Sequence, residues 1–199
     1  MARIDRAGLE RAVARSSDAT SDFDLNPGII LPDGAAKRPA GVLIAIQEVG
    51  DGHLLYLTKR SSRLKHHPGQ IAFAGGKVDP GDISPVAAAL REAKEEIGLP
   101  PENVTVLGTL PIHETVTGFL VTPVVALITK PFDPIPEAGE VDEVFTVPLT
   151  HVMDRSRFRV EQRQWLGEWR RYYTVPYGPY YIWGATARIL RGLAERLST

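Results

Sequence analysis

The sequence predicts a mixed α+β domain. About seven segments have the length and apolar content of β-strands, and two longer segments, one near the middle and one at the end of the chain, have helical periodicity. The length of 199 residues is that of one domain with a short appendage. The apolar fraction of 43% is typical of globular proteins and excludes wholesale disorder.

We expect an N-terminal arm over residues 1–40 and a functional domain over residues 41–199. Within the arm, the alternation of apolar and charged residues at Ile4–Ala14 predicts a short helix. Residues 17–40 are rich in Ser, Asp, Gly and Pro, which favours irregular structure over a further regular element.

Strands are expected along most of the remaining chain. Two apolar runs, Gly41–Gln47 and His53–Lys59, flank the turn signal Asp51-Gly52 and predict a β-hairpin. Apolar residues at helical spacing predict a closing helix over Trp183–Leu197. Other short runs predict strands at Gln70–Ala74, Thr105–Leu110, Phe119–Ile128 and Glu143–Val147, and a second hairpin from Arg157–Gln164 and Glu168–Val175.

The composition excludes several classes of function. Lys and Arg number 23 and Asp and Glu number 24, so the formal net charge of −1 lacks the basic surplus of a general nucleic-acid binder. The absence of cysteine excludes a disulfide framework, a Cys-ligated metal and a Cys nucleophile. No apolar run approaches the ~20 residues needed to cross a bilayer. We therefore expect a cytoplasmic protein that binds neither nucleic acid nor membranes.

The central helix is predicted over Pro85–Ile97. Ser84 is a favourable N-cap, Pro85 suits the first helical position, and Gly98 suits the position after the last turn. Apolar residues at helical spacing predict one buried stripe, formed by Val86, Leu90, Ala93 and Ile97.

Three glutamates of this helix, Glu92, Glu95 and Glu96, are expected on the face opposite the apolar stripe. On a helical wheel Glu92 and Glu96 lie about 40° apart, and Glu95 lies about 60° to the other side of Glu92. Carboxylates late in a helix oppose the helix dipole at a cost of ~0.3–1 kcal/mol each, and they also repel one another. A helix selected only for stability would carry Lys or Arg at these positions.

Two interpretations of the acidic face are open. One is a solvated surface on which Arg91 and Lys94 screen the carboxylates. The other is a site for a divalent cation, since Mg²⁺ prefers hard oxygen ligands and is usually held by one or two carboxylates together with substrate phosphates. The preceding residues favour the second interpretation: Gly75-Gly76 permits close approach of the backbone to a ligand, and Asp79 and Asp82 add acids in the joining loop.

At this point the sequence resembles the Nudix hydrolase family, whose box reads G-x5-E-x7-R-E-U-x-E-E-x-G-U, with U apolar. The run from Arg91 to Leu99, REAKEEIGL, matches the second half of the box at every fixed position. In the first half, counted from Gly76, Asp82 fills the acidic position, and eight residues rather than seven separate it from Arg91.

A stretched box of this kind is similar to that of the coenzyme A diphosphatases, a subgroup of the family. The upstream segment Leu55–Gly76, LYLTKRSSRLKHHPGQIAFAGG, is also similar to the segment that precedes the box in that subgroup. Lys65 stands where Arg is usual, and Ala74 replaces the usual Pro.

The resemblance implies a Nudix fold, in which a mixed β-sheet lies between helices. It also implies hydrolysis of the diphosphate bond of coenzyme A or its thioesters with Mg²⁺ or Mn²⁺, giving 3′,5′-ADP and 4′-phosphopantetheine or its acyl form. Two alternatives remain. The substrate could be another nucleoside diphosphate derivative such as ADP-ribose, or the chain could be a catalytically silent Nudix-like module that binds a nucleotide.

The family pattern further implies roles for individual residues. The metal ligands would be Glu92, Glu95, Glu96, the carbonyl of Gly76, and Asp82. The catalytic group would consist of Glu92 as ligand or base, Arg91 to orient Glu92 or the glycine loop, and a carboxylate from a distant loop, for which Glu140 is the first candidate and Glu114 the second.

A run of four positive charges without an intervening acid lies just upstream of the glycines. It is either a solvated loop or a cradle for the phosphates of the substrate, since Arg forms bidentate phosphate contacts and Lys acts as a point charge. The substrate-binding candidates are Lys59, Arg60, Arg63 and Lys65. His66 and His67 are expected to structure this loop rather than to catalyse. The aromatic-rich stretch 165–181 favours core or dimer packing over base stacking. The expected partners are a small nucleotide as substrate and, in a possible homodimer, a second copy of the chain.

Overall fold

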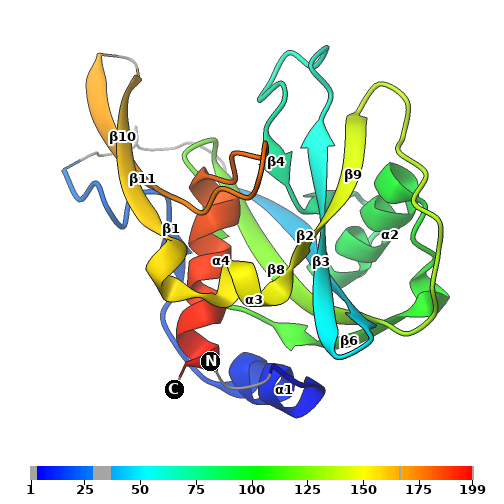
Figure 1. Ribbon diagram of the computed structural model, residues 1–199. Helices are drawn as coiled ribbons and strands as arrows, with labels where there is room; N and C mark the ends of the chain where they lie inside the picture. The colour runs from blue at the N-terminus through cyan, green and yellow to red at the C-terminus, as the bar shows by residue number, and fades with distance from the viewer. Residues whose placement is uncertain (1–3, 29–36, 166, 199) are drawn as a thin grey trace.

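The computed structural model describes residues 4–28, 37–165 and 167–198. The helices and strands of these residues follow one another along the chain as Figure 1 shows. In order they are α1 (Arg6–Ala14), β1 (Thr20–Ser21), β2 (Arg38–Val49), β3 (Gly52–Arg60), β4 (Ile71–Ala72), β5 (Ala74–Lys77), α2 (Pro85–Ile97), the 3₁₀ helix Pro101–Asn103, β6 (Val104–Thr109), β7 (His113–Glu114), β8 (Phe119–Ile128), β9 (Val141–Pro148), α3 (Leu149–Met153), the 3₁₀ helix Arg155–Arg157, β10 (Arg159–Trp165), β11 (Glu168–Thr174) and α4 (Gly184–Leu197).

Strand β2 is the centre of a mixed sheet. It runs parallel to β8 over almost its whole length on one side. On its other side the first half, Ala40–Leu43, pairs with β5, and the second half, Ile46–Val49, pairs with β3 in the predicted hairpin. The sheet therefore divides into two branches where β2 passes from one partner to the other. Strand β9 extends the β3 branch, and β6 and β7 extend the β8 side.

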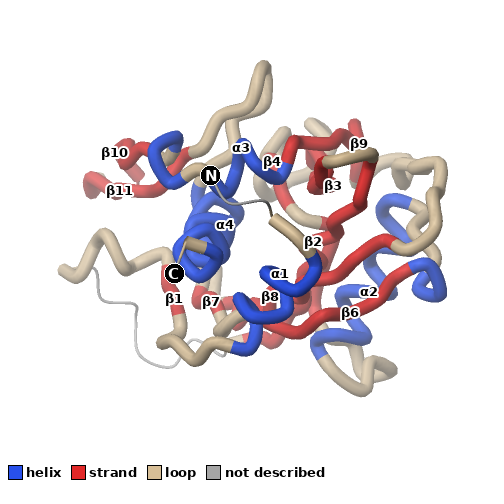
Figure 2. Tube along the Cα trace, turned by 60° about the horizontal axis from the view of Figure 1, so that its bottom comes forward, coloured by secondary structure: helices blue, strands red, loops and turns tan. Residues whose placement is uncertain are grey.

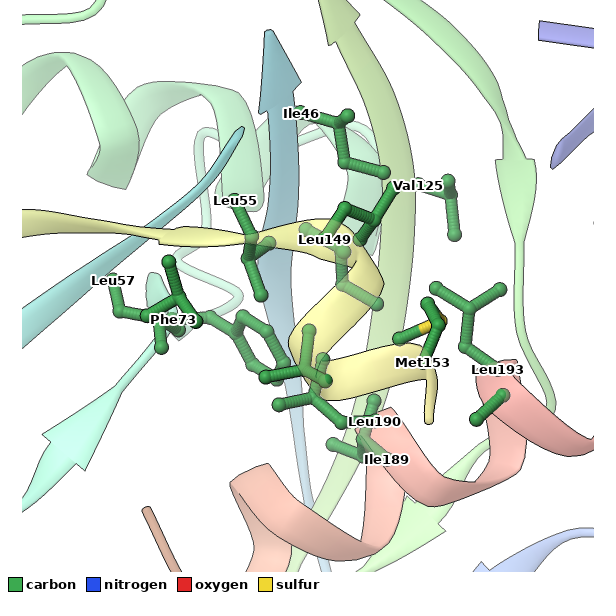
Figure 3. Close-up of a cluster of buried hydrophobic side chains, with 14 of the residues drawn as sticks. Ile46, Leu55, Leu57, Phe73, Val125, Leu149, Met153, Ile189, Leu190 and Leu193 are labelled. Atoms are coloured by element: carbon green, nitrogen blue, oxygen red, sulfur yellow. The ribbon is translucent and has the colours of Figure 1, made fainter. Parts of the chain in front are cut away.

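Helices cover both faces of this sheet, which confirms the predicted Nudix arrangement of a mixed sheet between helices (Figure 1). Successive residues of β2 point to opposite faces, as the strand period of two requires. Leu43 and Ala45 pack with α2 in one buried cluster, and Ile44 and Ile46 belong to a larger cluster on the other face. In Figure 3 the side chains of α3 and α4 in the larger cluster, among them Met153 of α3, lie close to those of the sheet strands.

Helix α2 has the predicted bounds, Pro85–Ile97. The Ser84 hydroxyl accepts a hydrogen bond from the Ala87 amide at 3.1 Å, and Gly98 adopts the left-handed conformation with φ 72° that ends the helix. Both predicted caps are confirmed.

The predicted buried stripe of α2 is wrong in part. The side chains buried against the sheet are those of Ala88, Ala89, Ala93, Glu96 and Ile97, whereas Val86 and Leu90 are only partly buried at its margin. The physical reason is the close approach of the helix to the sheet, which leaves room there mainly for alanine.

Glycine makes this close approach possible. A Cβ atom built on Gly41 of β2 would lie 1.9 Å from the Pro85 carbonyl oxygen at the start of α2. A Cβ atom on Gly75 would lie 2.4 Å from the Gly41 carbonyl oxygen, and Gly75 has φ 155°. Backbone therefore lies against backbone at the junction of β2, β5 and α2, and only glycine fits.

The remaining differences from the predictions concern short elements. The predicted strand Gln70–Ala74 is two strands, β4 paired with β3 and β5 paired with β2. In the N-terminal arm, β1 pairs in parallel with β7, and α1 packs against α4 and β6 (Figure 2). Residues 29–36 of the arm lie outside the described residues. The predicted second hairpin is confirmed as β10–β11, a separate two-stranded sheet. Within the described residues, no helix is long and apolar enough to cross a membrane.

Candidate active site

Glu96 lies on the sheet-facing side of α2, and the prediction that it shares the face opposite the apolar stripe is wrong. The residue is only 5% exposed, and its carboxylate accepts a hydrogen bond from the Gly75 amide at 3.0 Å. It follows Ala89 and Ala93 at spacings of seven and three residues, which put all three on one helical face. The carboxylate is therefore held against Gly75 of strand β5.

Burial makes this carboxylate hard to ionise. Burial raises the pKa of Glu96 to about 7, against the opposing effect of the Gly75 amide. The negative charges of Glu92 and Glu140 raise this pKa further, and Arg60 lowers it. Burial also raises the pKa of Glu92, and Arg91 partly offsets the shift. The Glu92 carboxylate thus lies close enough to Glu96 to disfavour the charged form of Glu96.

This shift predicts how the stability of the metal-free protein depends on pH. The folded state binds a proton at Glu96 up to about pH 7, whereas the unfolded chain releases it near 4.5, the ordinary pKa of a glutamate. The folded state thus holds more protons between these values, so the free energy of unfolding falls as pH rises through that window, by an amount of order 3 kcal/mol. Urea unfolding in EDTA at pH 5 and pH 8 measures this slope. The Glu96→Gln variant should have a clearly smaller slope, and an equal slope in both proteins would contradict the account.

Arg91 links α2 to the loop that precedes it. Its Nε and Nη2 donate to the two carboxylate oxygens of Asp82 at 3.1 and 3.0 Å, and Nη2 also donates to the Lys77 carbonyl at 3.2 Å. Its Nη1 donates to Glu92 at 3.0 Å and to Glu95 at 2.9 Å. The guanidinium therefore contacts Glu92, Glu95 and the end of β5, and its role in orienting Glu92 or the glycine loop stays a prediction.

Asp82 is occupied by contacts within the protein. Besides its two bonds with Arg91, it accepts a hydrogen bond from the Asp79 amide at 2.9 Å. The hydrogen bond from Arg91 is the main reason that the pKa of Asp82 is lowered. These contacts favour a positioning role for Asp82, and its role as a metal ligand stays a prediction.

Gly76 lies directly beneath Glu92. A Cβ atom at this position would be 2.3 Å from the Glu92 Oε1 atom. The structure therefore brings the second glycine of the pair, Glu92 and the Gly75–Glu96 hydrogen bond into one small region between β5 and α2.

The loop before β9 reaches the C-terminal end of α2. The amides of Ile135 and Glu137 donate to the carbonyls of Ile97 and Glu96, both at 3.0 Å, and so satisfy two groups that the helix itself leaves free. The Glu140 carbonyl accepts a hydrogen bond from the Ser61 amide at 2.8 Å. Glu140 is thereby close enough to affect the pKa values of Glu92 and Glu96.

Glu114, the second candidate for the distant carboxylate, lies in a different setting. It belongs to β7 and forms an ion pair with Lys37 at 2.8 Å. No hydrogen bond or ion pair links it to the carboxylates of α2 within the described residues. The geometry therefore favours Glu140.

The cationic run divides into two parts. Lys59 and Arg60 end β3 and are partly buried, and Arg60 is near enough to lower the pKa of Glu96. Arg63 and Lys65 are exposed in the following loop, which is closed by a hydrogen bond from the Arg60 amide to the Gln70 carbonyl at 2.9 Å. The structure thus places Arg60 beside the carboxylates and leaves Arg63 and Lys65 at the surface.

The donor set suits a hard divalent cation. Three carboxylates of α2 and the backbone oxygen of a glycine are the kind of ligand that Mg²⁺ takes. Within the described residues no group of three or more His, Cys, Asp or Glu side chains converges on one point, and Arg91 bridges Glu92 and Glu95. Burial is the main cause that raises the pKa values of Glu92 and Glu96, and a bound cation would favour the charged form of both carboxylates.

A protein-family model covers the part of the chain that holds this site. The NUDIX domain model matches residues 37–169, which include β2, the glycine pair and all of α2. The chain belongs to the Nudix hydrolase family. Members of this family hydrolyse nucleoside diphosphate derivatives, which are small-molecule nucleotide substrates. They generally use divalent metal ions.

Curated relatives resemble the chain over nearly its whole length. A protein named "Uncharacterized Nudix hydrolase NudL" from Enterobacter sp. (strain 638) is 43% identical over 180 residues, which cover 90% of this chain and 93% of the relative. The protein of the same name from Citrobacter koseri is 40% identical over 189 residues, 95% of this chain and 98% of the relative.

Solved structures agree on the fold. The Nudix hydrolase RenU of M. smegmatis is 27% identical, with a TM-score of 0.50 over 60% of this chain and 75% of that one. The NUDIX domain of Shewanella oneidensis NrtR, solved with ADP ribose, has a TM-score of 0.53 over 81% of this chain and 89% of that one. At 16% identity, the second likeness concerns the fold alone.

Proposed function

We propose that this Nudix hydrolase cleaves the diphosphate bond of coenzyme A or its thioesters, giving 3′,5′-ADP and 4′-phosphopantetheine or its acyl form. The observation that carries the proposal is the position of the segment Leu55–Gly76. It begins in β3, passes through the cationic loop, and ends at the two glycines that lie against Glu96 and Glu92. Its similarity to the coenzyme A diphosphatase segment therefore concerns residues beside the carboxylates.

Mg²⁺ or Mn²⁺ is the proposed cofactor. Glu92, Glu95, Glu96 and the Gly76 carbonyl are the residues that would hold it, with Asp82 as a further predicted ligand. When bound, such an ion neutralises the oxygens of the diphosphate and stabilises the leaving phosphate. Arg91 is a positioning residue in this scheme, since its contacts fix Glu92 and Glu95 on the face that the substrate meets.

The chemical step is attack of water on one phosphorus of the diphosphate. The new P–O bond forms as the bond from that phosphorus to the bridging oxygen breaks, and the bridging oxygen leaves with the other phosphate. The proton of the water passes to a carboxylate, for which we propose Glu140, with Glu92 as the alternative. Glu140 suits this role because it comes from outside α2 and is already close to Glu92 and Glu96.

The proposed phosphate cradle consists of Lys59, Arg60, Arg63 and Lys65. Arg60 is best placed for the diphosphate, because it lies near Glu96. Arg63 and Lys65 are exposed in the loop that follows Arg60 and complete the proposed cradle. A cytoplasmic location and a homodimeric state stay predictions from the sequence.

A substrate panel tests the proposal. Purified protein is incubated with Mg²⁺ or Mn²⁺ and coenzyme A, acetyl-coenzyme A or ADP-ribose, and the products are identified by mass spectrometry. We expect a kcat/KM for coenzyme A at least about tenfold above that for ADP-ribose, a difference of about 1.4 kcal/mol in transition-state binding, and no turnover in EDTA.

Other outcomes would assign the chain elsewhere. If kcat/KM for ADP-ribose equals or exceeds that for coenzyme A, coenzyme A is not the preferred substrate. Tight nucleotide binding without turnover of any compound would indicate a catalytically silent module.

A further inference from the structure

A cluster of arginine and aromatic side chains lies on the β10–β11 hairpin. The guanidinium carbon of Arg163 in β10 is 4.3 Å from the centre of the Trp183 ring. The ring of Tyr172 in β11 meets the same indole edge-on, with centroids 5.2 Å apart. Arg170, directly opposite Arg163 in the hairpin, lies over the ring of Phe23 from the N-terminal arm at 5.6 Å. Three segments distant in sequence therefore build one surface.

This cluster adjoins the loop that carries the cationic run. Trp183 is the residue before α4, and the position next to it, Gly184, lies against the side chain of Gln70. The Gln70 carbonyl in turn accepts the hydrogen bond from the Arg60 amide. The Thr186 hydroxyl of α4 donates to the Ile71 carbonyl at 3.1 Å and fixes the helix to β4. The hairpin and the loop both rise on the same side of the molecule (Figure 1).

Two arginines lie close to His67, Arg60 at the end of β3 and Arg163 in the hairpin. Arg60 lowers the pKa of Glu96. Arg60 and Arg163 both lower the pKa of His67. After burial, Arg60, His66 and Arg163 are the groups that lower the pKa of His67, and Asp22 opposes them. His67 has φ 54°, the only positive φ of a non-glycine residue in the described part of the chain. Such backbone strain is common where a loop forms a binding site.

Arg163 has the features of an anion-binding group. Its side chain is exposed, and it forms no ion pair with a carboxylate among the described residues. The nearby Glu161 is instead bonded to the hydroxyl of Tyr181 at 2.5 Å. Stacking on the face of Trp183 holds the guanidinium in place and leaves the N–H groups in its plane free to donate.

We propose that Arg163, held by Trp183, binds a phosphate monoester at the nucleoside end of the substrate and so selects substrates that carry one. The inference rests on the proposed function, in which that group is the 3′-phosphate of coenzyme A. The diphosphate lies at Glu92 and Glu96, and the nucleoside end extends past Arg60 and His67 towards the hairpin. The aromatic stretch thereby gains a role in recognition, in addition to the packing expected from the sequence.

The test compares two substrates that differ only in this phosphate, coenzyme A and 3′-dephospho-coenzyme A. Arg163→Gln should raise the KM for coenzyme A about tenfold, as loss of one charge-assisted hydrogen-bonding group implies, and leave kcat and the KM for the dephospho compound unchanged. Arg171→Gln is the matched control, because Arg171 is in the same hairpin on the opposite face, opposite Gln162. It should alter neither KM. Equal effects of Arg163→Gln on both substrates, or none on either, would overturn the inference.

A binding measurement separates this inference from the proposed function. Isothermal titration calorimetry of the metal-free protein with adenosine 3′,5′-bisphosphate and with 5′-AMP requires no turnover. Arg163→Gln should weaken binding of the bisphosphate about tenfold and leave that of AMP unchanged. If wild-type protein does not hydrolyse coenzyme A but shows this loss, the proposed function fails and the subsite stands. If it hydrolyses coenzyme A and bisphosphate binding is unchanged in the variant, the subsite fails and the function stands.

Discussion

Glu96→Gln should lower kcat with Mg²⁺ by about a thousandfold or more while the metal-free protein remains folded. A loss of this size corresponds to about 4 kcal/mol of transition-state stabilisation, within the range that a catalytic metal supplies. The amide keeps the volume of the side chain and can still accept the hydrogen bond from the Gly75 amide, so the packing against β5 is retained. What it removes is a buried negative charge, which the cation needs and the fold does not.

Two measurements accompany this variant. The melting temperature in EDTA at pH 8 should rise, since the cost of a buried carboxylate disappears. Glu102→Gln, at an exposed position just after α2, is the control and should change neither kcat nor the melting temperature. Wild-type turnover by Glu96→Gln, or a fall in its metal-free melting temperature, would contradict the role given to Glu96.

Gly41→Ala should be strongly destabilising, with a loss of several kcal/mol in the free energy of unfolding. The added Cβ would lie 1.9 Å from the Pro85 carbonyl oxygen and 3.1 Å from the Ala89 nitrogen, and both are backbone atoms of α2 that cannot rotate away. Relief requires the whole helix to move from the sheet, which opens the alanine-lined contact and displaces Glu92 and Glu96. Overpacking of this kind typically costs 1–3 kcal/mol, and displacement of backbone costs more.

Urea unfolding followed by circular dichroism measures this loss. Gly81→Ala is the matched control, because nothing lies within 4 Å of a Cβ at that position. Its free energy of unfolding should stay within about 0.5 kcal/mol of wild type, as for most surface substitutions. A Gly41→Ala protein as stable as wild type would show that α2 does not depend on this close approach.

The predictions that held rest on local chemistry. The bounds of α2 follow from Ser84, Pro85 and Gly98, each of which acts on residues within one turn. The two hairpins follow from apolar runs on either side of a short turn, and their partners are adjacent in sequence.

The predictions that failed depend on distant contacts. The helical wheel assigns the buried stripe of α2 to Val86, Leu90, Ala93 and Ile97, and only Ala93 and Ile97 of these are fully buried. In the structure the absence of a side chain at Gly41 lets α2 lie close to strand β2. Alanines and Glu96 therefore occupy much of the contact between the helix and the sheet. The sequence of α2 alone does not indicate that the helix packs on Gly41, which is more than forty residues upstream. The division of Gln70–Ala74 into two strands likewise depends on two partner strands, β3 and β2, and on the branching of the sheet between them.

In the candidate site, too, features set by residues close in sequence could be predicted, and features set by distant contacts could not. The acids of α2 and Arg91 can be found from their spacing, because one helical turn brings them together. Arg163 carried no sequence signal, since its neighbours Trp183 and Tyr172 come from other segments. The aromatic-rich stretch 165–181 favours packing over base stacking, so it does not single out Arg163 either.

The hydrogen bonds from Ile135 and Glu137 to the last turn of α2 have a consequence for how the site varies among proteins of this fold. They hold the loop that carries Glu140, the proposed base, against the helix that carries Glu92 and Glu96, so a shift of either segment would displace both sets of carboxylates. Insertions upstream of Ile135 can lengthen the loop without altering the site. A residue inserted between Glu137 and Glu140 would move Glu140 away from Glu92 and Glu96. The hydrogen bond from the Glu137 amide to α2 fixes where the segment that leads to Glu140 begins.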